Sequence, residues 1–297
     1  MGLALVIHAA VASLFAGSPP FTAGLTPQQK AALVVVSGLP APPGVGGVLV
    51  QRWSRNAPRP SGALVFVDQE GGATRAFREL PPARPAAAYA TEAQALAAGQ
   101  ATGLALRRSG VGVDLAPVLD SPDGPLGARQ FRRASIGLAF GRGLGAAGEG
   151  WCAKHFPGLG SAAVSTDDRP HVNAVIRPRE VAGFRAAVAA GAPCVLVNNA
   201  FYGALGRRRA SLEPAAYRLL RSTGFRGVAI TDSLSIVAHP PRYWPIAAAR
   251  AGADLLLFTS PKHARAAIEE LLPLARSGEL DAHVARVLSF RARYAAR

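Results

Sequence analysis

The chain has 297 residues, of which 49% are hydrophobic, with 32 glycines and 24 prolines. This length and composition fit one large globular domain, and no long linker, low-complexity run or short repeat divides the sequence. The two cysteines, Cys152 and Cys194, are too few for a metal site or a disulfide scaffold. Both lie in apolar stretches typical of buried strands, so we expect buried free thiols.

The chain is strongly basic, with 33 Lys and Arg against 18 Asp and Glu and a formal net charge of +15. Such a charge can draw a protein to nucleic acid, anionic lipid or an anionic polymer such as cell wall. The densest basic run, GRRRA at 206–210, has no interleaved aromatic residues and lies in no nucleic-acid-binding motif. We therefore expect no nucleic-acid partner, and we attribute most of the charge to arginines spread over surface helices. An anionic cell-wall polymer stays open as a partner.

Residues 1–25 form an apolar N-terminal segment, and the first charged residue is Lys30. The stretch LALVIHAAVASLFAG (3–17) resembles the apolar region of a signal peptide, with small residues at 16–18 for cleavage. It lacks the positive residues that normally precede such a region, and it is short for a membrane span. We interpret it as an export signal or an anchor, which makes the chain exported or membrane-associated. The alternative is an extra packed helix in a cytoplasmic protein.

From residue 26 onward, short apolar runs alternate with helical patterns. The helical patterns cover 26–38, 91–110, 177–192, 211–225, the first part of 243–261, and 262–278. The strand-like runs cover 45–51, 62–72, 111–120, 151–158, 194–200, 227–233 and the second part of 243–261. This alternation is typical of a parallel sheet with crossover helices. We predict an α/β protein in which residues 26–297 form a single (β/α)8 barrel of the TIM type, with an open sheet as the alternative.

Polar residues collect at the C-terminal ends of the predicted strands. They are Asp68-Gln69-Glu70, Asp120, Lys154-His155, Asn198-Asn199 and Thr231-Asp232-Ser233. In a barrel these ends converge on one face, which is where barrel enzymes place their active sites. No GxGxxG follows the first strand-like run, which argues against a dinucleotide site.

Seven segments resemble, in order, the motifs of family 3 glycoside hydrolases. They are FVDQEGG (66–72), VDLAPVLD (113–120), AKHFPG (153–158), VLVNNAFYGAL (195–205), ASL-P (210–214), GFRGVAITDSLSI (224–236) and ARAGADLLLF (249–258). Within the family the chain is most similar to the single-domain β-N-acetylglucosaminidases that trim peptidoglycan-derived sugars. The resemblance spans about residues 26–290 and implies a carbohydrate substrate, with neither a metal nor another cofactor.

The resemblance implies that Asp232 is the nucleophile of a retaining glycosidase. Such an enzyme needs a second, proton-donating group about 5–5.5 Å from the nucleophile. An aspartate that caps a strand-to-helix turn is the alternative interpretation of Asp232. Sugar-binding positions implied by the same motifs are Asp68, Lys154, His155, Arg75 and Asn199, of which Arg75 is shifted by one place and Asn199 replaces another residue type. Lys154 and His155 are successive strand residues, so both can face a site only if the strand twists or bulges there.

The loop KHFPGLGSAAVSTDD (154–168) departs from the family pattern, which reads K-H-F-P-G-H-G-D-T and then D-S-H. Without gaps, Leu159 and Ser161 replace the first His and Asp, and 165–167 reads Ser-Thr-Asp where the family has the catalytic Asp-Ser-His. Asp167 or Asp168 could serve as the proton donor, because most retaining glycosidases use a carboxylic acid. His171 could do so only if the loop were remodelled.

One arginine motif is also altered. The family sequence IGDRSFG corresponds to IGLAFG (136–141) in this chain, where the arginine is absent.

Two hypotheses follow. The chain is a retaining glycosidase with Asp232 as nucleophile and Asp167 or Asp168 as donor, or it is an impaired relative that binds sugar or cell wall, or regulates, without catalysis.

Overall fold

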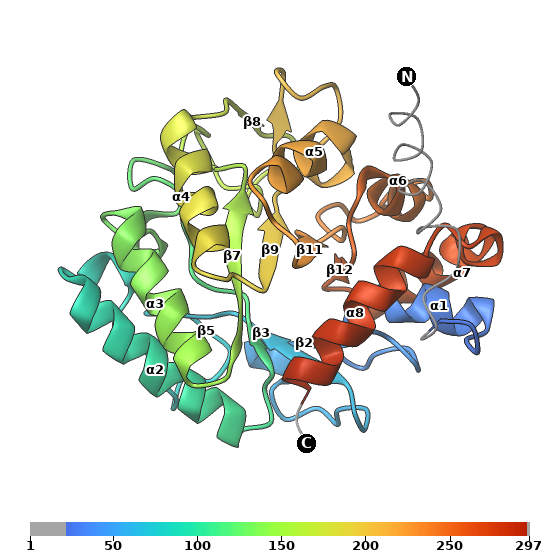
Figure 1. Cartoon of the computed structure of the whole chain (residues 1–297), viewed down its shortest axis with the longest axis horizontal. Coiled ribbons are helices and arrows are strands. Elements are labelled where there is room, and N and C mark those ends of the chain that lie inside the picture. The colour runs from blue at the N-terminus through green and yellow to red at the C-terminus, as the bar shows by residue number, and fades with distance from the viewer. Residues whose placement is uncertain (1–21, 296–297) are drawn as a thin grey trace, which may run out of the picture.

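The computed structural model describes residues 22–295, so most of the apolar N-terminal segment lies outside the described residues. Eight parallel strands form one sheet in the order β11-β9-β7-β6-β3-β2-β1-β12, shown in Figure 1. A parallel bridge between Ile230 and Leu255 joins the two ends of this order and closes the barrel. The strands are β1 (Val35–Gly38), β2 (Gly47–Val50), β3 (Leu64–Val67), β6 (Val113–Asp114), β7 (Gly150–Phe156), β9 (Cys194–Val197), β11 (Val228–Thr231) and β12 (Leu256–Phe258). The predicted α/β barrel is confirmed.

Helices surround the barrel, and two short sheets and four single-turn helices lie in its loops. The helices are α1 (Pro27–Leu33), α2 (Glu92–Arg108), α3 (Ala134–Ala146), α4 (Pro178–Ala189), α5 (Pro214–Ser222), α6 (Trp244–Ala251), α7 (Pro261–Ser277) and α8 (Asp281–Tyr294). Strand β4 (Gln69–Gly71) pairs with β5 (Thr74–Arg75), and β8 (Asn173–Ala174) pairs with β10 (Phe201–Tyr202). The 3-10 helices are η1 (Arg52–Ser54), η2 (Ala86–Ala88), η3 (Gly127–Arg129) and η4 (Ala210–Leu212). None of the helices in residues 22–295 has the length and apolar character needed to span a membrane.

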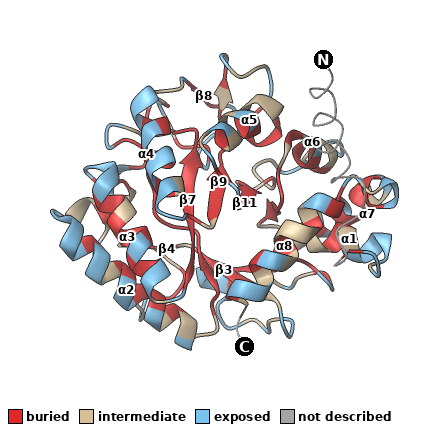
Figure 2. Ribbon diagram, viewed as in Figure 1, coloured by how far each residue is buried: buried red, intermediate tan, exposed pale blue. Residues whose placement is uncertain are grey.

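The core has two layers, one inside the barrel and one between the sheet and the helices. Strand β3 shows the alternation that separates them, since Leu64 and Phe66 pack inside the barrel while Val65 and Val67 join the outer layer. Figure 2 shows buried residues along the strands and the inward faces of the helices.

Helix α8 closes the N-terminal end of the barrel. Phe290 and Tyr294 pack with the residues that fill the barrel interior, and Phe290 stacks on Phe66 with ring centroids 6.4 Å apart. The Arg291 guanidinium donates to the carbonyls of Val45 and Gly46, just before β2. The opposite, C-terminal end of the strands is therefore the end left free for a site.

The prediction of one helix over 26–38 is wrong in its second half. Thr26 and Gln29 form a capping box at the start of α1, as the Thr-Pro pattern indicates, but the helix ends at Leu33. Residues 35–38 instead form β1, whose Val35 pairs in register with Leu256 of β12. Consecutive β-branched valines disfavour a helix and suit a pleated, buried strand. This segment is the eighth strand that the sequence pattern did not reveal.

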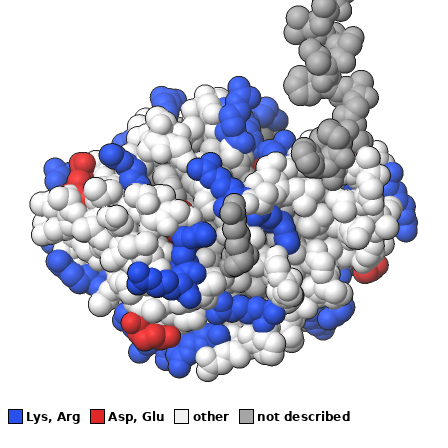
Figure 3. Space-filling model, turned by 60° about the horizontal axis from the view of Figure 1, so that its bottom comes forward, with Lys and Arg blue, Asp and Glu red and all other residues white. Residues whose placement is uncertain are grey.

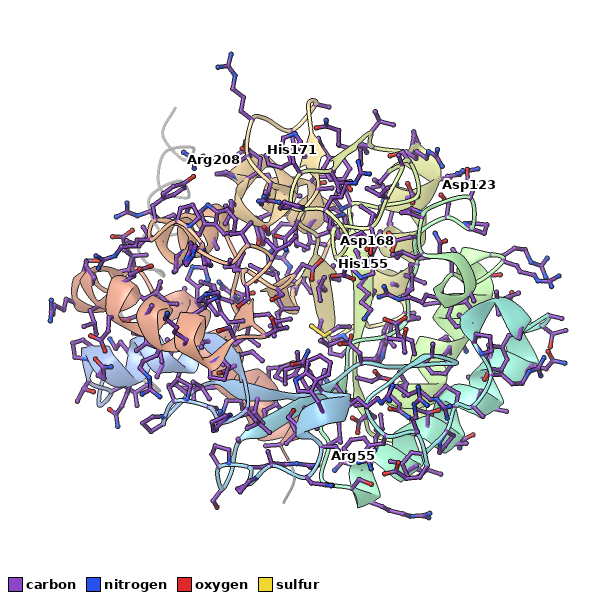
Figure 4. All side chains as sticks on the ribbon, turned by 180° about the vertical axis from the view of Figure 1, so that it is seen from behind. Arg55, Asp123, His155, Asp168, His171 and Arg208 are labelled. Atoms are coloured by element: carbon purple, nitrogen blue, oxygen red, sulfur yellow. A yellow bond between two sulfur atoms is a disulfide. The ribbon has the colours of Figure 1, made fainter. Side chains whose placement is uncertain are left out.

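The prediction of two free thiols is also wrong. Cys152 of β7 and Cys194 of β9 are register partners on neighbouring strands, with their Cα atoms 4.4 Å apart, and their sulfurs form a disulfide. Figure 4 shows the bond in the middle of the ring of strands. Because facing residues on paired strands point to the same side, both sulfurs lie inside the barrel. A separation of 42 residues in the sequence gave no sign of this contact.

The disulfide generates a stability prediction. Joining residues 42 positions apart restricts the unfolded chain, and the double variant Cys152→Ala/Cys194→Ala should lose about 4 kcal/mol of unfolding free energy. Urea unfolding of the two proteins measures this difference. Thiol titration of the denatured, unreduced wild type should find no free thiol, and a count of two would contradict the bond.

Candidate active site

A cavity of about 340 Å³ lies at the C-terminal ends of the strands. Polar side chains from all around the barrel line it: Gln51 after β2, Asp68 after β3, Thr74 in β5, Arg129 in η3, Lys154 and His155 in β7, Asp167 in the long loop after β7, Asp232 and Ser233 after β11, and Thr259 after β12. The structure thus brings together five of the predicted site residues, namely Asp68, Lys154, His155, Asp167 and Asp232. They meet where barrel active sites lie.

A larger hollow of about 570 Å³ lies at the other end of the barrel, between α8 and residues 226–228. Apolar side chains, arginines, Ser289 and Tyr294 line it, and its lining contains no carboxylate or histidine. The cavity of about 340 Å³ contains carboxylates and a histidine, so it is the better candidate for general acid-base or nucleophilic chemistry.

A buried network of charges forms one wall of that cavity. The Lys154 Nζ lies 2.6 Å from Asp68 Oδ1 and 2.6 Å from Glu70 Oε1. The Arg129 guanidinium binds Glu70 with two parallel contacts, from Nε to Oε2 at 2.8 Å and from Nη2 to Oε1 at 2.9 Å. Planar guanidinium and carboxylate groups match in this bidentate geometry. The Asp68 side chain stays 38% exposed, so it can also accept hydrogen bonds from a ligand in the cavity.

The network fixes the protonation states of Glu70 and Lys154. Burial alone would raise the pKa of Glu70, but the Lys154 and Arg129 cations lower it to about 2. Burial alone would lower the pKa of Lys154, but the Asp68 and Glu70 carboxylates raise it above its usual range. The Glu70 carboxylate and the Lys154 ammonium therefore stay charged over the whole physiological pH range.

Arg129 is a site residue that the sequence analysis missed. The stretch IGLAFG (136–141) lies in α3, so matching the family's IGDRSFG to it was wrong. The arginine occurs ten residues earlier, in the stretch LGARQF (126–131), where the spacing of Leu, Gly, Arg and Phe agrees with the motif. Testing the match at this position would have found it.

Lys154 and His155 both line the cavity, although they are adjacent in β7. The register of β7 against β9 shifts between Ala153 and Phe156, and the peptide bond between Lys154 and His155 is cis. The shift in register makes the end of the strand irregular, which is the condition under which both side chains can face one site. His155 Nδ1 lies 2.6 Å from Asp120 Oδ2, so the buried Asp120 fixes the orientation of the ring.

Asp232 follows β11 at the floor of the cavity. Its Oδ1 accepts a hydrogen bond from the backbone N–H of Ser233 at 2.8 Å. Burial raises the pKa of Asp232 to about 6, and the nearby Asp167 carboxylate adds to the rise, while His155 opposes it. The group is thus ionised at neutral pH and accepts a proton only slightly below it.

Asn199 supports this turn from outside the cavity. Its Nδ2 donates to the Ser233 carbonyl at 2.8 Å, and its Oδ1 accepts from the Ser211 hydroxyl at 2.6 Å. Arg75 also lies outside the cavity, because its guanidinium donates to the carbonyls of Gly72 and Arg78. The structure therefore brings neither of these two predicted sugar contacts to the cavity.

The long loop after β7 presents one carboxylate to the cavity. Asp167 lines it with a side chain that is 71% exposed, and Arg129 Nη1 lies 3.7 Å from its Oδ2. Asp168 is exposed and is not part of the lining. His171 stacks on the ring of Phe201 with centroids 4.3 Å apart, away from the cavity lining. Figure 4 shows His171 well away from His155, toward the rim of the molecule.

The described part of the chain offers no cluster of three or more His, Cys, Asp or Glu side chains arranged to hold a metal ion. The polar groups of the cavity instead suit hydroxyl-rich ligands, because they combine carboxylate acceptors with cationic and imidazole donors.

Residues 49–290 match the family described as Glycosyl hydrolase family 3 N terminal domain. A β-hexosaminidase of Stenotrophomonas maltophilia is 35% identical over 237 residues, which cover 69% of each chain. The β-hexosaminidase LpqI of Mycobacterium tuberculosis is 30% identical over 283 residues, which cover 82% of this chain and 71% of that protein.

Two solved structures are similar over nearly the whole chain. A family 3 β-N-acetylglucosaminidase from Paenibacillus superposes with a TM-score of 0.80 at 26% identity, covering 91% of this chain and 62% of its own. A β-N-acetylhexosaminidase from Beutenbergia cavernae superposes with a TM-score of 0.78 at 25% identity, covering 90% and 99%.

The charge network yields a test that needs no substrate. Because the pKa of Glu70 falls from 4.5 to about 2 on folding, its ionisation contributes stability that is present above pH 4.5 and is lost as the pH falls toward 2. The shift corresponds to about 3 kcal/mol, so Glu70→Gln should be less stable by about that amount at pH 7. Urea unfolding at pH 7 and at pH 3 should show that the difference in unfolding free energy between wild type and Glu70→Gln is smaller at pH 3.

The exposed Glu79 gives the matched control. Glu79→Gln makes the same chemical change without touching a cation network and should change stability by less than about 0.5 kcal/mol. Equal effects of the two substitutions would contradict the assigned role of Glu70.

Proposed function

Because the chain belongs to glycoside hydrolase family 3, we propose that it is a retaining glycosidase acting on β-N-acetylglucosaminyl or related β-glycosides of cell-wall origin. The relatives named β-hexosaminidase and the similar β-N-acetylglucosaminidase structure support this substrate class. The observation that carries the proposal is the presence of Asp232 and Asp167 in one cavity beside the charged wall formed by Lys154 and Arg129.

In the proposed reaction Asp232 attacks the anomeric carbon while Asp167 protonates the leaving oxygen. The bond to the leaving group breaks and a covalent glycosyl-enzyme forms; Asp167, now a carboxylate, then takes a proton from the water that releases the sugar. Asp68, Lys154 and His155 hold the hydroxyl groups of the sugar. Asp167 is preferred over Asp168 because it lines the cavity and Asp168 does not.

A second candidate function is sugar or cell-wall binding by an impaired relative. It is favoured by the sequence Ser165-Thr166-Asp167, which stands where the family has the catalytic Asp-Ser-His, and by the high exposure of Asp167. A donor carboxylic acid normally needs a partly desolvated site to keep its proton near neutral pH. General acid help is worth roughly 10²–10⁴ in rate, so its loss would leave binding intact.

We also propose that the chain works outside the cytoplasm. Disulfides persist mainly in oxidising compartments, so the bond between Cys152 and Cys194 favours export, as does the apolar N-terminal segment. Figure 3 shows many Lys and Arg side chains and few Asp or Glu over one face of the molecule. Such a surface suits contact with an anionic cell-wall polymer.

The test uses two aryl β-N-acetylglucosaminides, one with a good and one with a poor leaving group. Wild type should cleave both, and Asp232→Ala should cleave neither. Asp167→Asn should lose about 10²–10⁴ in rate on the poor leaving group and much less on the good one, because a good leaving group needs little protonation. Hydrolysis rates under single-turnover conditions measure the difference.

Asp168→Asn is the control, since it removes the adjacent carboxylate that is not in the cavity lining. It should behave as wild type. If wild type cleaves only the activated substrate, Asp167 is not a donor. If it cleaves neither while a sugar still binds, the second candidate function replaces the first.

The pKa of Asp232 sets a further expectation. The nucleophile must be ionised, so kcat/KM on the activated substrate should fall below about pH 6, approaching tenfold per unit. Asp167→Asn removes a negative charge that raises this pKa, and the acidic limb should therefore move to lower pH. A limb that stays in place, or moves upward, would contradict the effect of the Asp167 charge on the pKa of Asp232.

A further inference from the structure

Arg209 is a buried cation at the end of an exposed basic run. Arg207 and Arg208 are exposed, whereas Arg209 is 7% exposed. Within residues 22–295 no carboxylate pairs with its guanidinium, and burial lowers the pKa of that group. Burying a charge costs free energy unless other groups compensate it. An uncharged side chain would fill this place at lower cost, so the charge at Arg209 points to a role beyond packing.

Two aromatic rings lie against the Arg209 guanidinium. Its Cζ is 4.9 Å from the centroid of the Phe201 ring and 5.0 Å from that of the Trp244 ring. A cation over an aromatic face is attracted by the ring, and more strongly where water is excluded. Arg209 Nη1 also donates to the Asn199 carbonyl at 3.1 Å. Arg209 therefore joins α6, which begins at Trp244, to the segment that follows β9.

Phe201 also holds the end of the loop that carries Asp167. The His171 ring stacks on the Phe201 ring with centroids 4.3 Å apart. The Phe201 N–H donates to the Val172 carbonyl at 2.8 Å, and Phe201 of β10 pairs with Asn173 of β8. His171 is four residues after Asp167. The contacts of Phe201 therefore limit where the Asp167 carboxylate can lie.

Asn199 supports the turn that carries Asp232. Its Nδ2 donates to the Ser233 carbonyl at 2.8 Å, and the Ser233 N–H donates to Asp232 Oδ1 at 2.8 Å. A retaining glycosidase needs its two carboxylates about 5–5.5 Å apart. Misplacement of a reacting group by about 1 Å can cost about 10²-fold in rate. The segment after β9 thus supports both carboxylates of the proposed reaction.

We propose that Arg209 is a positioning residue, which holds the loop of Asp167 and the turn of Asp232 at a fixed separation. The proposal rests on the proposed function, because it takes these carboxylates as donor and nucleophile. Arg209 acts through two neighbours, since Phe201 anchors the loop and Asn199 supports the turn. One arginine can make both contacts because a guanidinium stacks on a ring with its face and donates hydrogen bonds from its edge.

The first test compares Arg209→Met with Arg209→Lys on the two aryl β-N-acetylglucosaminides, well below the unfolding temperature of each variant. Arg209→Met removes the charge and the planar group but keeps a long side chain. It should lower kcat on the poor leaving group about 10²-fold and leave KM within about twofold, because Asp68, Lys154 and His155 still hold the sugar. Arg209→Lys keeps the cation and should restore part of the rate. A lower unfolding temperature of Arg209→Met with kcat unchanged would show a merely structural residue and overturn the proposal.

The second test needs no turnover. Hydrogen exchange is followed by mass spectrometry in peptides that cover 163–172 and 231–235, with α2 as an internal reference. In Arg209→Met both segments should exchange about tenfold faster than in wild type, while α2 stays unchanged. If Arg209→Met does not fold, Arg209→Lys replaces it and should show the same pattern with a smaller increase. His171→Ala removes only the stack on Phe201, so it should speed exchange in 163–172 alone.

Arg208→Met is the matched control, because it makes the same change at the neighbouring arginine, whose side chain is exposed. It should leave hydrolysis and exchange unchanged. Faster exchange in only one of the two segments of Arg209→Met, or in neither, would overturn the coupling, even if wild type hydrolyses both substrates. Faster exchange in both segments of a protein that hydrolyses nothing would support the coupling and reject the proposed hydrolysis.

Discussion

The structure of the site depends on one interaction, the contact of the buried Lys154 ammonium with two carboxylates. It joins the end of β7 to the turn after β3, and Glu70 extends the connection to Arg129 in η3. Removing one member of such a group leaves an uncompensated buried charge, which is far more costly than the net value of an intact pair. The network therefore holds three separate segments of the chain in one geometry. Lys154 and Glu70 are buried, whereas the Asp68 side chain stays 38% exposed and can reach a ligand.

Two carboxylates at the cavity, Glu70 and Asp232, have opposite electrostatic surroundings. Glu70 touches both Lys154 and Arg129, which lower its pKa to about 2, whereas Asp232 accepts a backbone hydrogen bond, faces Asp167, and has a pKa of about 6. When neighbouring acids have surroundings that push their pKa values apart, they can take different roles in one site. A permanently ionised group serves structure and ligand orientation. A group that is ionised but weakly stabilised retains the reactivity that a nucleophile needs.

The sequence predicted the barrel and the converging strand ends because both follow from local pattern. Alternating apolar runs and helices require a parallel sheet, and polar residues at strand ends need only their place in the order. Three features that the sequence analysis missed involve contacts between distant segments. The strand Val35–Gly38 exists because β12 pairs with it, Cys152 meets Cys194 through the β7–β9 register, and Arg129 reaches Glu70 across 59 residues.

The packing of the loop after β7 limits where this loop can carry a proton donor. Asp120 accepts from the Leu159 N–H at 2.7 Å, Glu180 accepts from the Gly160 N–H at 2.9 Å, and Leu159 is buried in the outer core. Ser161 then pairs with both backbone groups of Val175. This first part of the loop is committed to packing, and a polar donor there would have to break these contacts. A proton donor supplied by this loop must therefore come from the part beyond it, where Asp167 reaches the cavity lining. In the proposed reaction, Asp167 is held beside Arg129 with most of its side chain exposed, so a sugar that fills the cavity must desolvate it before it can donate a proton.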